Sequence, residues 1–115
     1  MSIGDLGYFT IPVRDISRGR TFYGGLFGWK FEFKNPADPY AHIGNTTPGG
    51  GLHVNDAPSP QVWFKVEDIK AAVAKVRQLG GQAEEPQHSD SGWSCGCRDD
   101  QGGSFNLWQP APGFF

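Results

Sequence analysis

Two segments of the chain alternate apolar and polar residues in the way typical of half-buried β-strands. They are residues 6–13 and 61–66, and both are rich in β-branched and aromatic side chains. An aspartate follows each segment after one intervening residue, Asp15 in the first case and Asp68 in the second. An aspartate in this place caps the first free amides of a helix. The pattern therefore predicts a strand followed by a helix, twice.

Apolar spacing predicts which face each helix buries. In the second helix the apolar residues follow helical spacing along one face: Ile69, Ala72, Val73, Val76 and Leu79. The first helix is expected to bury its own apolar residues in the same way: Ile16, Phe22, Tyr23, Leu26 and Phe27. Glycine ends both helices, at Gly28 and at Gly80-Gly81.

Short β-strands separated by turn residues are predicted after each helix. Those of the first half are residues 29–34, 40–44 and 51–55, and those of the second half are residues 82–85, 92–98 and 104–109. Most of the 9 prolines and seven of the 17 glycines lie in the connections between the predicted segments. Each half therefore has the order strand, helix, three strands.

A weak internal repeat supports this division. The segment from Val13 to Ile16 recurs as Val66 to Ile69, an offset of 53 residues, and the same offset relates Gly50 to Gly103. We interpret the chain as two βαβββ modules, about residues 1–55 and 56–115, in one α+β domain. The expected architecture is a curved mixed sheet with the helices on its convex face and a cleft on its concave face.

Composition and charge narrow the class of protein. The 115 residues are 14% aromatic, which argues against a disordered chain. A net charge of −2 with interspersed signs excludes binding to nucleic acid driven by electrostatics. No apolar run is long enough to cross a membrane, and the first residues lack the features of a signal peptide. We therefore expect a cytoplasmic protein whose two cysteines are reduced.

Strand alternation places aromatic and polar side chains together on the face opposite the apolar core. These residues are Tyr8, His53, Gln61, Trp63, Asn106 and Trp108. Aromatic walls with a few polar groups describe a small-molecule pocket, but aromatic residues are also enriched at subunit interfaces. Both interpretations stay open at this point.

Cys95 and Cys97 require a separate argument. Because alternate residues of a strand share a face, Cys95 and Cys97 lie on the same face as Trp93. Their Cα atoms are then about 6.5–7 Å apart, which is long for a disulfide. Buried thiols are the favoured interpretation. If their face is the cleft face, Trp93 and Cys95 join the ligand-binding residues.

The order of elements and two motifs resemble the vicinal oxygen chelate superfamily, which contains glyoxalase I, extradiol dioxygenases and bleomycin-resistance proteins. The motifs are the segment from Tyr8 to Asp15, which leads to Phe22–Trp29, and the closing hairpin from Arg98 to Gln109. Metal enzymes of this superfamily take one ligand from the first and last strand of each module. The resemblance assigns those positions to Tyr8, His53, Gln61 and Asn106.

The residues at those positions predict that the metal site has been lost. Only His53 is a strong neutral ligand, and no carboxylate balances a divalent charge. The resemblance then implies a homodimer that sequesters a small aromatic molecule, such as an antibiotic, without metal, cofactor or catalysis. The C-terminal Phe114 and Phe115 are expected to cover a neighbouring subunit or the mouth of the cleft. The alternative is a metal-dependent lyase, isomerase or dioxygenase with an atypical site around His53.

Overall fold

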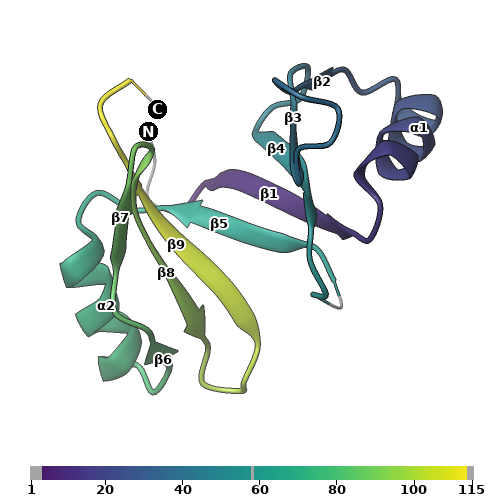
Figure 1. The fold of residues 1–115 in the computed structure, drawn as a ribbon. Helices are drawn as coiled ribbons and strands as arrows, with labels where there is room; N and C mark the ends of the chain where they lie inside the picture. Colours follow the sequence, from purple (N-terminus) through teal and green to yellow (C-terminus); the bar gives the residue numbers. More distant parts are fainter. Residues whose placement is uncertain (1–3, 58, 114–115) are drawn as a thin grey trace. The chain divides into compact units, whose positions relative to one another are not determined.

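The structure is a computed structural model that describes residues 4–57 and 59–113 (Figure 1). It divides into two compact units, which we describe separately. The N-terminal unit is residues 8–61, and the C-terminal unit is formed by the residues before Tyr8 together with those from Val62 onward. The predictions for Phe114 and Phe115 concern residues outside the described part of the chain.

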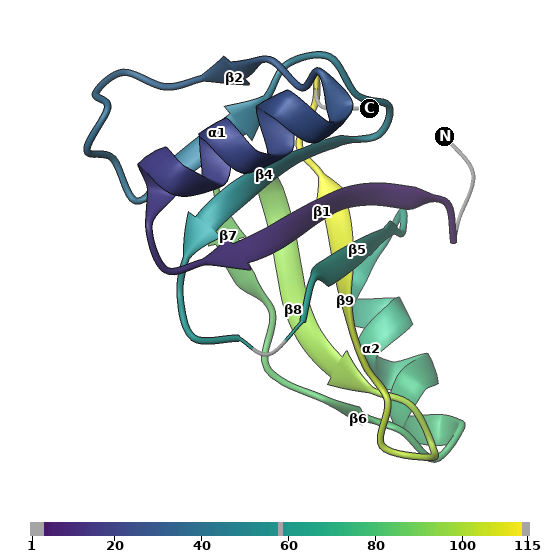
Figure 2. The ribbon, with the colours of Figure 1, turned by 90° about the vertical axis from the view of Figure 1, so that its right-hand side faces the viewer.

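The N-terminal unit contains one helix and four strands of a mixed sheet. Its elements are β1 (Leu6–Val13), α1 (Ile16–Phe27), β2 (Phe31–Glu32), β3 (Tyr40–Ile43) and β4 (Gly49–Val54). The strand order is β2-β3-β4-β1, with β1 parallel to β4 and the other pairs antiparallel. Helix α1 runs along β4 (Figure 2) and also contacts β3. It covers a core in which Ala41 and Leu52 are fully buried.

The C-terminal unit repeats this plan with one additional strand. Its elements are β5 (Gln61–Lys65), α2 (Ile69–Gln78), β6 (Gln82–Ala83), β7 (Gln87–Ser89), β8 (Gly92–Arg98) and β9 (Ser104–Pro110). The strand order is β5-β9-β8-β6, with β5 parallel to β9, and β7 also pairs with β8. Residues Gly4 and Asp5 exchange backbone hydrogen bonds of 2.8–2.9 Å with Lys65. The α+β class and the predicted order of elements are therefore confirmed, with β7 as an addition to the βαβββ order of the C-terminal half.

Both helix starts confirm the predicted caps. The Asp15 carboxylate accepts a hydrogen bond from the Arg18 amide at 3.0 Å, and Asp68 accepts from the amides of Lys70 and Ala71. The first helix ends at Gly28, whose φ of 72° is in the left-handed region that favours glycine. The local signals at the helix ends were thus sufficient to define them.

The buried face of α1 differs from the prediction. Phe22, Leu26 and Phe27 are more than half exposed, whereas Ile16 and Gly19 are buried. A Cβ at Gly19 would lie 3.0 Å from a Val13 methyl group, so the missing side chain lets α1 approach the sheet closely. The helix therefore packs through Ile16, Gly19 and Tyr23, whereas Phe22, Leu26 and Phe27 point away from the core.

The extent of two strand segments also differs from the prediction. Strand β2 is limited to Phe31–Glu32, and the Lys30 amide just before it donates to the Asn45 side chain at 2.8 Å. The connection between the predicted strands 82–85 and 92–98 contains strand β7, and the exposed His88 ring lies 4.8 Å from the Trp93 ring. Among the described residues, no helix has the length and apolar character needed to span a membrane.

Candidate functional site

The sheet of the N-terminal unit has one face covered by α1 and an opposite face, which we call its helix-free face. Residues that are paired across neighbouring strands share a face of the sheet. Pro12 pairs with His53, which also pairs with Tyr40, and Tyr8 lies on the same face as Pro12 by alternation. The predicted placement of Tyr8 and His53 on one face is therefore confirmed.

Two further side chains of this face were not among the predicted site residues. His42 pairs with Gly51 and with Glu32, which places both side chains on the helix-free face with Tyr8. The period of two along β3 could have identified His42 through its relation to Tyr40. Glu32 could not be found in this way, because β2 has only two residues and its register depends on the fold.

Tyr8, His42 and Glu32 form a chain of neighbouring polar side chains that come from β1, β3 and β2. The Tyr8 hydroxyl oxygen lies 3.3 Å from Nδ1 of His42, and the two ring planes differ by only 7°. On the other side of the ring, Nε2 of His42 lies 4.0 Å from a carboxylate oxygen of Glu32. Glu32 fits against Gly44, where a Cβ would lie 2.9 Å from its second carboxylate oxygen.

Burial controls the ionisation of Tyr8. Removal of the phenolate from water raises the pKa of Tyr8 from its ordinary value of 10.0 to about 12. The side chain is therefore a neutral hydroxyl near pH 7. It can exchange hydrogen bonds, but it supplies no negative charge to a cation.

His53 lies in a second aromatic contact on the same face. Its ring is 5.9 Å from that of Tyr40 in an edge-to-face arrangement, and the Asn55 side-chain amide lies 3.4 Å from its Nδ1. The Tyr40 ring extends across Gly51, where any Cβ would overlap the phenol. His53 is the exposed member of this group and is accessible to a small molecule.

The C-terminal unit also has a face that α2 does not cover. The pairs Trp63–Asn106 and Lys65–Trp108 place both tryptophans and the asparagine on this helix-free face. Gln61, at the start of β5, is exposed and shares the face of Trp63 by alternation. The structure thus brings Trp63, Asn106 and Trp108 together as the sequence predicts.

Two of these side chains are anchored to backbone carbonyl groups. The Asn106 amide donates to the carbonyl oxygen of Val62 at 3.0 Å, and the Trp108 indole donates to that of Ser91 at 2.9 Å. Gly7 permits the close approach of the Trp108 ring, because a Cβ there would lie 2.8 Å from it. Trp108 can therefore offer a ligand its ring surface while its N–H group bonds within the protein.

The structure places Trp93 and Cys95 on the α2 side of the sheet and not with the predicted ligand-binding residues. Cys95 pairs with Leu107 and Trp93 with Gln109, so both belong to the side of the sheet that faces α2. Cys95 and Cys97 are buried in the core under α2, and Trp93 packs against that core. They are therefore not on the helix-free face with Trp63. The favoured interpretation of buried, free thiols is confirmed.

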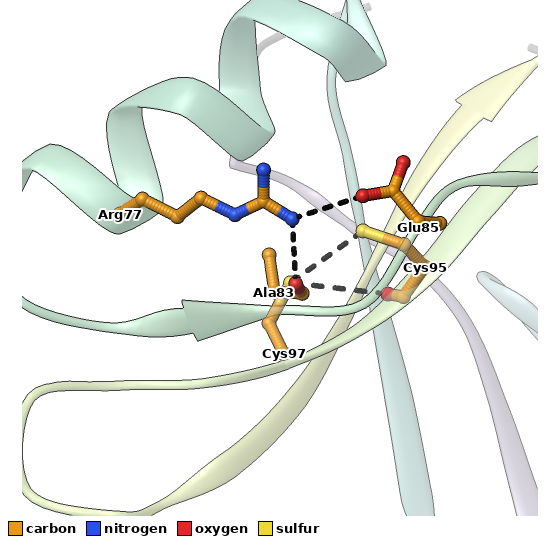
Figure 3. Close-up of polar contacts among 5 residues, drawn as sticks. All are labelled: Arg77, Ala83, Glu85, Cys95 and Cys97. Carbon is orange, nitrogen blue, oxygen red and sulfur yellow. Dashed lines mark hydrogen bonds and ion pairs between the residues drawn. The ribbon is translucent and has the colours of Figure 1, made fainter.

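The two thiols are close together but protected from ionisation. Their sulfur atoms are 3.6 Å apart, next to the Arg77 guanidinium group that donates to the Ala83 carbonyl (Figure 3). Burial raises the pKa of both cysteines, and that of Cys97 reaches about 12. Reactivity with electrophiles requires the thiolate, so the folded pair is unreactive near pH 7.

Comparison with known proteins identifies the family. Residues 8–108 match the family described as "Glyoxalase-like domain". The chain belongs to this glyoxalase-like domain family. The "Anthracycline biosynthesis protein DnrV" of Streptomyces peucetius is 30% identical over 119 residues, which cover 96% of this chain and 43% of DnrV. This glyoxalase-like domain thus spans less than half the length of that relative.

Solved structures have the same fold at low sequence identity. The methylmalonyl-CoA epimerase of Mycobacterium tuberculosis has a TM-score of 0.70 at 16% identity, with 96% of this chain and 90% of the epimerase covered. The homoprotocatechuate 2,3-dioxygenase of Brevibacterium fuscum has a TM-score of 0.74 at 17% identity, with 96% of this chain and 37% of the dioxygenase covered. The resemblance to the vicinal oxygen chelate superfamily is confirmed at the level of the fold.

The side chains at the four metal-ligand positions of that superfamily do not fit a divalent cation. Tyr8 is a neutral phenol, Gln61 and Asn106 are amides, and Asn106 is already bonded to a backbone carbonyl. Only His53 is a strong ligand of the imidazole type. Within the described part of the chain, no three His, Cys, Asp or Glu side chains are grouped so that they could hold a metal ion.

Proposed function

We propose that this glyoxalase-like domain binds a flat, partly aromatic small molecule without a metal ion. The observation that carries the proposal is the chemistry at the metal-ligand positions. Three of the four side chains are neutral hydrogen-bonding groups, and Trp63 and Trp108 lie on the same face as Asn106. Such a set suits stacking and hydrogen bonding better than coordination of a cation.

The C-terminal unit by itself offers aromatic rings on which a flat ligand can stack. Trp63 and Trp108 are partly exposed on the helix-free face, with Asn106 between them in the pairing of the strands. Contact between aromatic rings contributes about 0.5–1.5 kcal/mol beyond the burial of area. The name of DnrV also places a relative in the biosynthesis of anthracyclines, which contain a planar ring system.

The N-terminal unit by itself offers hydrogen-bonding groups to a small molecule. His53 is exposed and can bond to a ligand through its ring nitrogens, and Tyr8 offers a neutral hydroxyl group. Binding without conversion needs no base to be activated near these groups. Sequestration of an antibiotic by a cytoplasmic homodimer stays a prediction, and light scattering of the purified protein measures its oligomeric state.

A binding experiment with an anthracycline probe tests the proposal. We expect daunorubicin to bind in isothermal titration calorimetry, and Trp63→Ala to weaken binding about threefold to tenfold, because a ring contact is lost. Trp93→Phe is the matched control, since Trp93 faces α2, and it should bind as tightly as the wild type. Binding that is equal in wild type and Trp63→Ala would contradict the proposal.

Treatment with a chelator separates this function from that of a metal enzyme. Binding of daunorubicin should be unchanged after dialysis against EDTA, because no metal participates. Loss of binding that Zn²⁺ or Mn²⁺ restores, together with loss of the metal in His53→Ala, would favour the metal-dependent alternative.

A further inference from the structure

A row of four residues crosses the helix-free face of the C-terminal unit. The Glu84 amide donates to the Gly96 carbonyl oxygen at 3.0 Å, which extends the pairing of β6 with β8 by one residue. Gly96 pairs with Asn106 on its other side, and Asn106 pairs with Trp63. Because paired residues share a face of the sheet, Glu84 lies on the same face as Asn106 and Trp63. All four residues belong to this one unit.

Gly96 leaves an open position in this row, and two oxygen atoms border it. A Cβ at Gly96 would lie 3.3 Å from Oε2 of Glu84 and 3.5 Å from Oδ1 of Asn106. The φ angle of Gly96 is not positive, so the backbone conformation does not require a glycine here. The absent side chain instead leaves space in which both oxygen atoms can contact one group of a ligand.

The Asn106 side chain is held in the orientation that this contact needs. Its amide nitrogen donates to the Val62 carbonyl oxygen at 3.0 Å. A carbonyl group accepts and does not donate, so this bond identifies the nitrogen end of the amide. The other end, Oδ1, is therefore the atom beside Gly96. It presents a fixed, neutral acceptor to a ligand.

Glu84 adds a negative charge to the same position. Its side chain is exposed, and among the described residues its carboxylate forms no ion pair. The adjacent Glu85 pairs with Arg77 of α2 at 3.4 Å (Figure 3). Arg98, the next residue of β8 on this face, donates to the Gly102 carbonyl oxygen at 3.1 Å, in the turn to β9. The carboxylate of Glu84 is thus left to interact with a cationic group from outside the chain.

We propose that Glu84 and Asn106 bind a protonated amino group of the aromatic ligand. The proposal rests on the proposed binding function and adds the functional group that the C-terminal unit recognises. An ammonium group has three protons to donate and no lone pair, so it can bond to both oxygen atoms at once. Its charge strengthens the bond to the carboxylate, and a neutral hydroxyl group lacks this contribution.

The spacing of the strands sets the size of such a ligand. Trp63 is two strands away from Gly96, which corresponds to about 10 Å at the usual distance between strands. A bicyclic aromatic ring that contacts Trp63 can therefore place an amino group over Gly96 on a short arm.

A pair of matched ligands tests the proposal. The probes are 2-naphthylmethylamine, whose amino group is protonated at pH 7, and 2-naphthalenemethanol, which has the same ring and a neutral hydroxyl group. The wild type should bind the amine about threefold to tenfold more tightly in calorimetry, because the amine alone gains a charged contact with an exposed carboxylate. In Glu84→Gln this ratio should fall to about one.

Glu85→Gln is the matched control. It removes the same charge from the adjacent residue, but Glu85 contacts Arg77 and not Gly96, so the ratio should stay at the wild-type value. An equal fall in both variants would show that the net charge of the protein attracts the amine, and it would overturn the proposal.

Gly96→Ala tests the geometry without a change of charge. The added methyl group would lie between Oε2 of Glu84 and Oδ1 of Asn106, so the ratio of affinities should again fall to about one. Circular dichroism shows whether the variant is folded. A folded Gly96→Ala protein that keeps the wild-type ratio would contradict a site at this position.

The binding results also separate this proposal from the proposed function. Equal affinity of the wild type for the two naphthalenes would overturn the amine site and leave aromatic binding intact. Failure of both probes and of daunorubicin to bind would remove the proposed function and the amine site together.

Discussion

The two units share a scaffold and differ in the side chains of their helix-free faces. In the N-terminal unit, the polar groups of this face contact one another through the Tyr8–His42–Glu32 chain. In the C-terminal unit, Asn106 and Trp108 bond to backbone carbonyl groups. The comparison indicates that the repeated fold preserves strands and caps, whereas the exposed face of each copy can acquire its own chemistry.

The cores of the two units are packed with different kinds of residue. In the N-terminal unit, Leu52 is fully buried, and Gly19 lets the helix lie close to it. In the C-terminal unit, Cys95 and Cys97 occupy the space under α2 together with Val73. A glycine thus permits close packing in the N-terminal core, and two small polarizable side chains fill the C-terminal core.

The largest expected effect comes from truncation of a leucine in each core. Leu52→Ala should lower the free energy of unfolding by about 3–5 kcal/mol, and Leu107→Ala by about 2–4 kcal/mol, because each leaves a cavity. Leu52 is 0% exposed and Leu107 is 7% exposed, which sets the order. Urea unfolding measures both values. Leu79→Ala, at a side chain that is 67% exposed, is the control and should change stability little.

A larger loss in Leu107→Ala than in Leu52→Ala would contradict this order. It would mean that the C-terminal core collapses less easily around a cavity than the N-terminal core. Unfolding in two separate transitions would assign each loss to its own unit.

Alkaline pH should affect the C-terminal core through its thiols. The pKa of Cys97 in the folded protein is about 12, above its ordinary value of 9.0, because of burial and the neighbouring Cys95. Above pH 9 the unfolded chain loses the proton that the folded chain keeps, so stability falls as pH rises from about 9 toward 12. The loss should reach at most about 1.4 kcal/mol per pH unit for each thiol.

Thermal unfolding between about pH 8 and pH 10.5 measures this effect. The double variant Cys95→Ala, Cys97→Ala should have a flatter pH dependence than the wild type. The matched variant in the N-terminal unit is Tyr8→Phe, which removes a phenol whose pKa is raised to about 12. It should flatten the pH dependence only above about pH 10. An unchanged slope in the double variant would show that the thiols do not cause the loss.

Much of the fold could be predicted because its signals are local. The bounds of β1 and β8, both aspartate caps and the left-handed Gly28 depend on adjacent residues. Strand alternation also sufficed to place Tyr8 with His53 and Trp63 with Asn106. These features need no knowledge of which element packs against which.

The remaining features depend on packing between elements. A glycine has no hydrophobic signal, so Gly19 could not be recognised as the centre of the buried face of α1. Strand alternation predicts that Trp93 and Cys95 share a face, but it does not predict which side of the sheet that face is on. The contact of Glu32 with His42 depends on the register of a two-residue strand.

The smallest expected effect concerns the outward apolar residues of α1. Phe22 and Leu26 are 62% and 59% exposed, so Phe22→Ala and Leu26→Ala should each change the free energy of unfolding by less than about 0.5 kcal/mol. Ile16→Ala, on the buried side of the same helix, should cost about 2–5 kcal/mol. If Phe22→Ala instead costs more than about 1.5 kcal/mol, the loss should be measured at several protein concentrations. A loss that grows with concentration would show that another copy covers this face, and a constant loss would show that α1 packs through the face that the sequence predicts.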